Sequence, residues 1–444
     1  MRSLRLFVLI ASIGSLPASA PASALAIDSI RPGVVVDTIH ASSDTSQTYA
    51  LYLPRAYDRA RHWPVLFLMD PRGRALVPMR LFRAAAERYG YIVMSSYQTQ
   101  SDGPVEPNDR AINALLNDAQ SKFSVDAHRF YFAGFSGTGR LAWNYGYSIP
   151  ENVAGLIEVG AGLPSPQLLL QRSVARDTTP FAVFLSVGTT DFNYEEVRAL
   201  DARLDAFGVR HHLEFFDGPH SWPPESVCTN AITWLELQAM RDGRLAVNHA
   251  LIDSIYANAV HSADSIARGD PYEASLLYRQ AAVDFAGLHD TREIVATTAK
   301  LAQSDAVKHS AKRASQLADE SQTALEREDA FFTDFSHADK PAGLDRLRSS
   351  LKLNEIIDHA RQTGDALGAL AAKRELSSIF VRASFYEPRR YLAQGDTLKA
   401  LTLYALAQSI QPDNAQLCAE RNQLFRSYAI RKSVAPELGC DRSH

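Results

Sequence analysis

Three side chains in this 444-residue sequence, Ser136, Asp191 and His220, have the types and the order needed for nucleophilic chemistry. A serine hydroxyl attacks a carbonyl carbon only when a base removes its proton, and an imidazole base needs a carboxylate to orient it. The spacing leaves room for strands and helices between consecutive members. The three residues together predict acyl transfer through the serine.

The residues around Ser136 suit a sharp strand-to-helix turn, because the apolar run in "FAGFSGTGRLAW" (132–143) leads into a helix-like segment. Such a turn exposes the hydroxyl above the sheet and crowds the backbone, so it needs the small neighbours Gly134 and Gly137. The usual pattern is Gly-x-Ser-x-Gly, but here Thr138 takes the fifth position and the glycine comes one residue later. Threonine is small enough for this place, although a purely structural turn is the alternative.

The two partners each follow an apolar run, Asp191 after 181–188 and His220 after 211–218. In parallel sheets, sites form at the carboxyl ends of the strands, so both residues are expected at the same rim as the serine. The alternatives are that Asp191 only caps a helix and that His220 is an ordinary loop histidine.

Other residues fit these two roles less well. Glu195 or Glu196 would serve in place of the aspartate if Asp191 only caps the helix. His211 and His212 begin their strand and therefore lie at the opposite edge of the sheet.

An oxyanion hole needs backbone N–H donors, and Gly137, at the start of the helix after the serine, supplies the first. The second is expected from "LMDPRGRA" (68–75), where proline has no N–H, which leaves Arg72 or Gly73. The side chain of Arg72 or Arg74 either faces the cleft or is solvated. We expect Phe135 and Trp222 beside the substrate, although Trp222 could equally pack its own loop.

The first half of the chain alternates short apolar runs with amphipathic segments. Continuous apolar runs are typical of strands covered on both faces, and repeated strand–helix–strand units imply a mostly parallel sheet flanked by helices. No long insertion that would build a large lid interrupts these units, which indicates an open cleft. The expected strands are 48–54, 64–70, 91–97, 129–135, 153–160, 181–188 and 211–218, and helices are expected at 80–89, 109–123, 139–147 and 194–207.

Beyond about residue 245 the strand pattern ends, and Ala, Leu, Arg and Glu recur at helical spacing. The segments 267–281 and 393–407 match in register, each with a Gly-Asp pair followed by Ala and Tyr, and 362–369 is a partial copy. This pattern resembles the tetratricopeptide-repeat class of helical hairpins, and a plain helical bundle is the alternative.

The stretches "GFSG", "GTTDFNY" and "GPHSWP", together with the order of strands, resemble the α/β-hydrolase superfamily, in particular its secreted esterase and polyhydroxybutyrate-depolymerase-like branch. The resemblance covers roughly residues 30 to 240. It implies hydrolysis of carboxylic esters through an acyl-enzyme, with Ser136 as nucleophile, His220 as base and then acid, and Asp191 as the residue that orients the histidine.

The N-terminus resembles a signal peptide, with Arg2 and Arg5 before a short apolar run and small residues before expected cleavage after Ala24 or Ala26. We therefore expect an exported, periplasmic or secreted protein without a stable membrane span. The expected regions are a signal peptide at 1–26, an α/β-hydrolase domain at 27–243 and a helical, tetratricopeptide-like domain at 244–444.

The three cysteines give no metal motif, and an exported chain could pair Cys418 with Cys440, leaving Cys228 as a buried apolar residue.

The net charge of −4 and the absence of a basic run argue against nucleic-acid binding. No cofactor or metal is expected. The expected substrate is a small-molecule or polymeric ester. The alternatives are an acyltransferase or peptidase using the same three residues, and a non-catalytic scaffold whose helical repeats bind a protein partner.

Overall fold

The computed structural model describes residues 30–165, 179–429 and 440. The expected signal peptide lies outside the described residues. Among the helices that are described, none combines the length and the apolar character that crossing a membrane requires.

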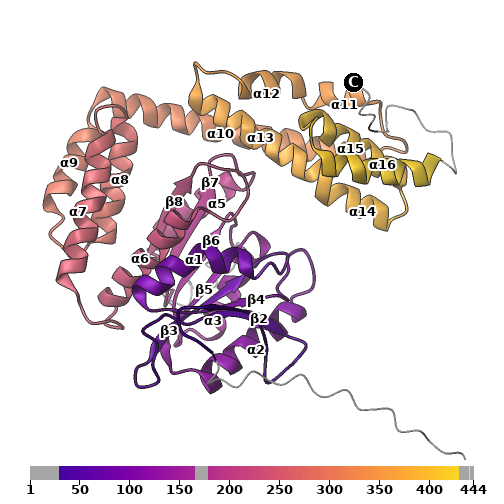
Figure 1. Ribbon diagram of the computed structural model, residues 1–444. Helices are drawn as coiled ribbons and strands as arrows, with labels where there is room; N and C mark the ends of the chain where they lie inside the picture. The colour runs from indigo at the N-terminus through magenta and orange to yellow at the C-terminus, as the bar shows by residue number, and fades with distance from the viewer. Residues whose placement is uncertain (1–29, 166–178, 430–439, 441–444) are drawn as a thin grey trace, which may run out of the picture.

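An eight-stranded sheet forms the centre of the first half of the chain (Figure 1). Its strand order is β1-β2-β4-β3-β5-β6-β7-β8; β2 pairs antiparallel with β1 and β4, and the remaining pairs are parallel. This arrangement confirms the fold class expected from the sequence. The strands are β1 Val35–His40, β2 Thr48–Tyr52, β3 Trp63–Met69, β4 Ile92–Ser96, β5 Val125–Phe135, β6 Val153–Val159, β7 Ala182–Gly188 and β8 His211–Phe216.

Helices cover both faces of this sheet. Along β3, Val65 and Phe67 point into one core while Leu66 and Leu68 point into the other, as the two-residue period of a strand requires. The first core is closed by α2 (Glu106–Lys122), α3 (Gly137–Ser148) and α5 (Tyr194–Ala206), and the second by α1 (Leu76–Tyr89) and α6 (Glu225–Arg241). Burial on both faces explains why the central strands are continuous apolar runs.

The second half of the chain, as far as it is described, is helical. In Figure 1 the long helix α10 leads from α7–α9 at one side of the sheet to α11–α16. The helices are α7 His249–Ile266, α8 Pro271–Asp284, α9 Arg292–Ala302, α10 Asp305–His337, α11 Leu344–Ser350, α12 Leu353–Ala360, α13 Ala366–Val381, the π-helical segment Arg382–Tyr386, α14 Glu387–Ala393, α15 Thr397–Ile410 and α16 Ala415–Ala429.

The matching Gly-Asp pairs occupy equivalent turns between consecutive helices. Asp270, Asp365 and Asp396 each precede a helix, and each side chain accepts a hydrogen bond from a backbone N–H of the first turn, at 2.9, 2.9 and 3.1 Å. Tyr278 and Tyr404 are both buried in helix contacts. The internal similarity therefore corresponds to similar local structure. Assignment to the tetratricopeptide class stays a prediction, since the 33-residue α10 separates the copies.

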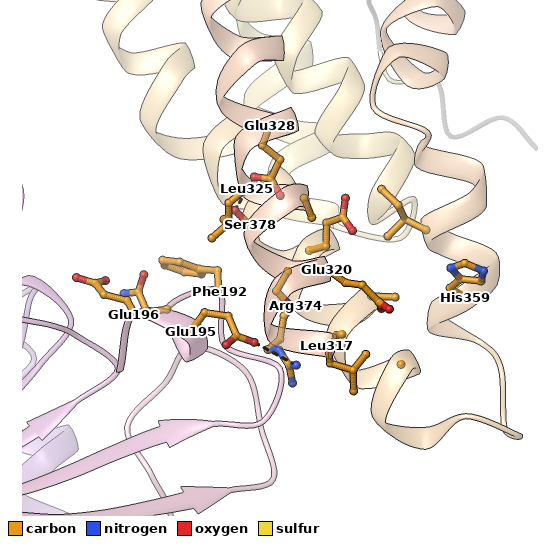
Figure 2. A pocket seen from close by; sticks show the side chains of 18 of the residues that line it. Phe192, Glu195, Glu196, Leu317, Glu320, Leu325, Glu328, His359, Arg374 and Ser378 are labelled. Carbon is orange, nitrogen blue, oxygen red and sulfur yellow. Dashed lines mark hydrogen bonds and ion pairs between the residues drawn. The ribbon is translucent and has the colours of Figure 1, made fainter. Parts of the chain in front are cut away.

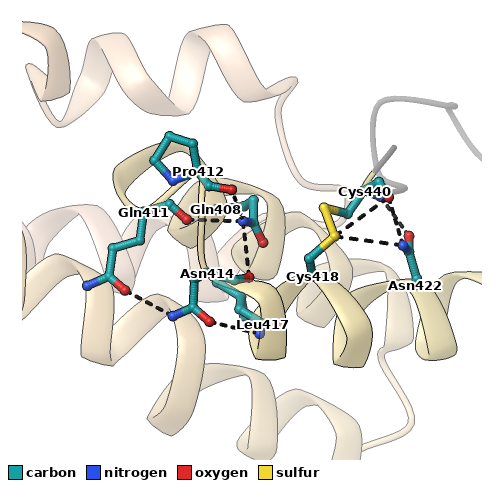
Figure 3. Close-up of a disulfide and its surroundings, with 8 residues drawn as sticks. All are labelled: Gln408, Gln411, Pro412, Asn414, Leu417, Cys418, Asn422 and Cys440. Atoms are coloured by element: carbon teal, nitrogen blue, oxygen red, sulfur yellow. Dashed lines mark hydrogen bonds between the residues drawn. A yellow bond between two sulfur atoms is a disulfide. The ribbon is translucent and has the colours of Figure 1, made fainter. Parts of the chain in front are cut away.

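Cys418 and Cys440 form a disulfide (Figure 3). Cys228 is free and buried. The side chain of Asn422 supports the link, because it donates to the carbonyl oxygen of Cys440 and accepts from its N–H, both at 2.7 Å. Burial raises the pKa of the Cys228 thiol, so this cysteine behaves as a small apolar core residue.

Substituting Cys418→Ser is expected to destabilise the end of the helical region by about 2–4 kcal/mol, because a bond closing a 22-residue separation restricts the unfolded chain. The measurement is the guanidinium midpoint of the full chain with and without dithiothreitol. Reductant should lower the midpoint of the wild type and leave that of Cys418→Ser unchanged. Equal midpoints for wild type and variant under oxidising conditions would contradict this prediction.

Candidate active site

Ser136 lies at the turn between β5 and α3, in a backbone conformation that side chains rarely adopt. Its φ is 56° and its ψ is −132°, and its N–H donates to the carbonyl oxygen of Val159 at 2.8 Å. The neighbouring glycines have no room for a side chain. A Cβ at Gly134 would lie 2.3 Å from the carbonyl oxygen of Thr138, and one at Gly137 would lie 2.5 Å from the Cβ of Ser101. The turn thus exposes the hydroxyl in the way the motif predicts.

Thr138, the departure from the usual motif, is fully buried and satisfied. Its hydroxyl donates toward the carbonyl oxygens of Met69 at 2.7 Å and Phe135 at 2.8 Å, and it accepts from the N–H of Phe135 at 3.2 Å. The threonine therefore ties the end of β3 to the serine turn instead of disrupting it.

The structure brings Ser136, His220 and Asp191 into one hydrogen-bonded row. The Nε2 atom of His220 lies 2.9 Å from the Oγ of Ser136, and its Nδ1 lies 2.9 Å from each carboxylate oxygen of Asp191. The strand register explains the convergence, because Val159 pairs with Ser186 and Gly188 pairs with Phe216, which aligns the carboxyl ends of β6, β7 and β8. Asp191 is fully buried and also accepts from the N–H of Asn193 at 2.8 Å.

The alternative carboxylates are engaged elsewhere. Glu195 pairs with Arg374 at 3.4 Å, and Glu196 pairs with Arg140 at 2.6 Å.

The alternative histidines lie in other contacts too. His212 contacts Asp284 of α8 at 2.9 Å. His211 gathers with Asp201 and Asp205, a set whose donor atoms lie within 4.8 Å of one another, and its two nitrogens already contact the carbonyl oxygen of Val209 and the carboxylate of Asp201. Neither histidine is part of the row that contains Ser136.

The candidate oxyanion donors differ in their positions. Gly137 is the first residue of α3, where N–H groups have no acceptor within the helix. The N–H of Arg72 donates to a carboxylate oxygen of Asp70 at 2.9 Å, and that of Gly73 donates to the Asp70 carbonyl oxygen at 3.1 Å. Arg72 lines the cavity that contains Ser136, whereas Gly73 lines a neighbouring one. Arg72 is therefore the better placed of the two. Its N–H already donates to Asp70, so it would have to donate to the oxyanion as well or leave Asp70 to do so.

Asp70 fixes this loop against the loop that carries His220. Its carboxylate accepts from Nε and Nη2 of Arg74 at 3.0 and 2.9 Å, and from Nε1 of Trp222 at 2.9 Å. Although burial opposes it, these hydrogen bonds lower the pKa of Asp70. Trp222 is therefore both a wall of the cavity and a brace of its loop, and the Arg74 side chain is held by Asp70.

Gly160, which the sequence analysis did not identify, allows the aspartate and the histidine to meet. Its φ is +57°, and a Cβ there would lie 2.8 Å from Oδ2 of Asp191 and 3.2 Å from Nδ1 of His220. Its carbonyl oxygen accepts from the side chain of Asn193 at 2.8 Å. A glycine directly after an apolar strand was the available signal.

Substituting Gly160→Ala is expected to lower kcat of any reaction that uses Ser136 as nucleophile by about 10–100-fold, because the added methyl displaces the Asp191–His220 pair. It should also cost about 1–3 kcal/mol of stability through its positive φ. Gly208→Ala is a matched control, since Gly208 has a φ of +65° and no atom of the described residues lies within 4 Å of the added Cβ. The control should lose stability only, and an equal loss of kcat in both variants would contradict the proposed crowding.

The cavity beside Ser136 has a volume of about 490 Å³, and aromatic rings line part of its wall. Phe135 and Phe192 flank the imidazole of His220, with ring centroids 4.5 and 4.2 Å from it. One wall of this cavity comes from the helical region, a contribution that the expectation of an open cleft without a lid did not include. The residues of that wall are Phe380, Val381, Ser384, Phe385 and Tyr386, which the sequence analysis missed together with Phe192.

Comparison with known proteins gives similarity at the level of solved structures only. No family model matches the chain, and no curated protein matches it. A fluorophosphonate-binding serine hydrolase F of Staphylococcus aureus is 16% identical over 46% of this chain and 98% of its own, with a TM-score of 0.40. The S-formylglutathione hydrolase of the same organism is 15% identical over 46% and 98%, with a TM-score of 0.38. A feruloyl esterase module from Clostridium thermocellum is 17% identical over 48% and 89%, with a TM-score of 0.37.

Proposed function

We propose that this protein hydrolyses carboxylic esters through an acyl-enzyme formed on Ser136. The observation that carries the proposal is the continuous row of contacts from the Ser136 hydroxyl through both nitrogens of His220 to Asp191, each at 2.9 Å. With Nδ1–H donating to the carboxylate, Nε2 is left as the acceptor for the serine proton. This is the arrangement that makes an alcohol nucleophilic.

In the first half-reaction, Oγ of Ser136 attacks the ester carbonyl carbon while Nε2 of His220 takes its proton. The carbonyl oxygen becomes an oxyanion, for which the N–H of Gly137 at the start of α3 is the first donor and that of Arg72 the second. The intermediate collapses, the C–O bond to the alcohol breaks, and His220 returns the proton to the leaving oxygen. Water then repeats the sequence and releases the acid, while Asp191 stabilises the imidazolium in both halves.

The substrate in this proposal is a small-molecule or polymeric ester. The polymeric ester is suggested by the resemblance of the sequence to the polyhydroxybutyrate-depolymerase-like branch. An acyltransferase or a peptidase would use the same three residues. A non-catalytic scaffold whose helical region binds a protein partner is the remaining alternative. Its weakness is that each of the three catalytic side chains is present and in contact.

We further propose that the protein acts after export. The expected signal peptide motivates this, and the Cys418–Cys440 disulfide supports it, because such bonds persist in oxidising compartments. Detection of the mature N-terminus at residue 25 or 27 in a periplasmic or culture fraction would test it, whereas an uncleaved chain confined to the cytosol would contradict it.

Labelling with a fluorophosphonate probe tests the enzymatic proposal. The mature wild-type chain should be labelled, and the label should map to Ser136 by peptide mass analysis and vanish in Ser136→Ala. Product analysis of a model ester with added alcohols separates the two acyl acceptors, since hydrolysis releases the free acid whereas transfer yields a new ester. An unlabelled wild type that leaves model esters intact would favour the scaffold alternative.

A further inference from the structure

A second cavity lies between the loop after β7 and the helices α10, α12 and α13 (Figure 2). Its volume is about 500 Å³, which is within the range of pockets that hold small molecules. Phe192 projects into it from the sheet side, and Leu325 and Ser378 face it from the helices. The apolar part of its lining includes Phe192, Leu317, Ala324, Leu325, Ile356 and Val381.

This second cavity adjoins the one that contains Ser136. Phe192, Val381 and Tyr386 line both of them, so these three residues form the boundary between the two spaces. Phe192 directly follows Asp191, and its ring centroid is 4.2 Å from that of His220. A group attached to an ester at Ser136 that extends past these three side chains would enter the second cavity.

The arginines around the second cavity are already paired. Among the described residues, each arginine of the lining has an acidic partner, and acidic side chains outnumber arginines there, so an anionic group is disfavoured. Burial raises the pKa of Glu328 to about 7, although a hydrogen bond from Ser378 at 2.7 Å opposes the shift. The apolar side chains of the lining therefore supply the surface that an uncharged group would contact. The pairs are Arg140–Glu196, Arg313–Asp365, Arg374–Glu195 and Arg382–Asp329, at 2.6, 2.8, 3.4 and 2.7 Å.

Arg374 of α13 holds the helical wall against the catalytic loop. Its Nη1 donates to the carbonyl oxygen of Thr189 at 3.3 Å, and its guanidinium lies 4.1 Å from the centroid of the Tyr194 ring. Both contacts, with the pair to Glu195, bracket the segment that carries Asp191. These contacts fix the helical wall of the second cavity relative to the loop that carries Asp191.

We propose that the second cavity is a distal subsite, which binds an uncharged apolar substituent of the ester that extends from Ser136 past Phe192, Val381 and Tyr386. The proposal rests on the proposed function and deepens it. It makes the helical region a determinant of substrate choice and predicts a preference for esters with long apolar groups over acetates. Each methylene group that becomes buried should raise kcat/KM about fourfold.

Filling the cavity tests this. Ala324 of α10 lines it and is buried, so Ala324→Trp should place an indole in the space, and Ser321→Trp, one turn earlier, is a second filling variant. The readout is the ratio of kcat/KM for p-nitrophenyl octanoate to that for p-nitrophenyl acetate, measured on the full mature chain. Filling should lower this ratio by about 10-fold or more, since several methylene groups lose their binding surface.

The matched control is Gln322→Trp, an exposed position on the same helix that is not part of the cavity lining, and it should keep the wild-type ratio. A parallel series of octyl and ethyl acetates shows whether the acyl or the alcohol group enters the subsite. Circular dichroism and thermal midpoints identify a filling variant that has not folded, in which case the other one decides.

The outcomes separate the two proposals. If the wild type hydrolyses acetates and both folded filling variants keep its ratios in both series, the distal subsite is wrong and the esterase proposal stands. If the wild type is not labelled by a fluorophosphonate and hydrolyses neither ester, the esterase proposal itself fails. A lower ratio in either series for both filling variants, with an unchanged ratio for Gln322→Trp, supports the subsite.

Discussion

Replacing His220 by alanine is expected to lower kcat for ester hydrolysis by about 10⁶-fold, and adding Ser136→Ala to that variant is expected to lower it little further. The reason is that the hydroxyl and the imidazole act as one unit. The serine at 2.9 Å from Nε2 is a poor nucleophile without its base, and the base has no catalytic use without the serine. The measurement is the turnover of p-nitrophenyl acetate by the single and double variants against the uncatalysed rate.

His261→Ala is the matched control for this experiment, because His261 is an exposed histidine on α7, and the variant should turn over the ester at the wild-type rate. Losses that multiply in the double variant would contradict the prediction, since they would mean that serine and histidine act independently.

Asp191→Asn is expected to retain the fold and to lower kcat by about 10⁴-fold. The asparagine amide can donate to Nδ1 of His220 in place of the carboxylate that accepts from it. That reversal leaves the proton on Nε2, which then cannot accept the proton of Ser136. Thermal midpoints and kcat of the purified variant, measured near pH 7, check both halves of this prediction.

Asp201→Asn is the control here, because Asp201 is another carboxylate in contact with a histidine, namely His211 at 3.1 Å, and its loss should leave kcat at the wild-type value. A wild-type rate in Asp191→Asn combined with a large loss in Glu195→Gln would transfer the orienting role to Glu195. The pairing of Glu195 with Arg374 argues against that outcome.

The sheet and the row of three side chains follow from local patterns in the sequence. Buried strands are continuous apolar runs, and the residue just after such a run must lie at the carboxyl edge of a parallel sheet. Ser136, Asp191 and His220 were all found by this rule. The edge strand β1 was missed, because its half-exposed residues, with Asp37 and Thr38 at its centre, form no such run.

The remaining features of the site depend on contacts that no local pattern contains. Gly160 matters only because Asp191 and His220 come together over it. Arg374 donates to Thr189 across 185 residues, from a helix whose own sequence shows only helical spacing. The wall formed by residues 380–386 likewise depends on how α10 places the last helices relative to the sheet, and local sequence patterns do not predict that placement.

The packing of α6 against α7–α9 has a practical consequence. Leu237 and Met240, near the end of α6, belong to one apolar cluster with Ile252, Tyr278 and Phe285 of the helical region. A fragment that ends at the expected boundary near residue 243 would expose these two side chains to water. It would also lack residues 380–386, which form one wall of the cavity beside Ser136. Such a fragment should be prone to aggregate during expression, and recombinant work should therefore keep both halves on one polypeptide.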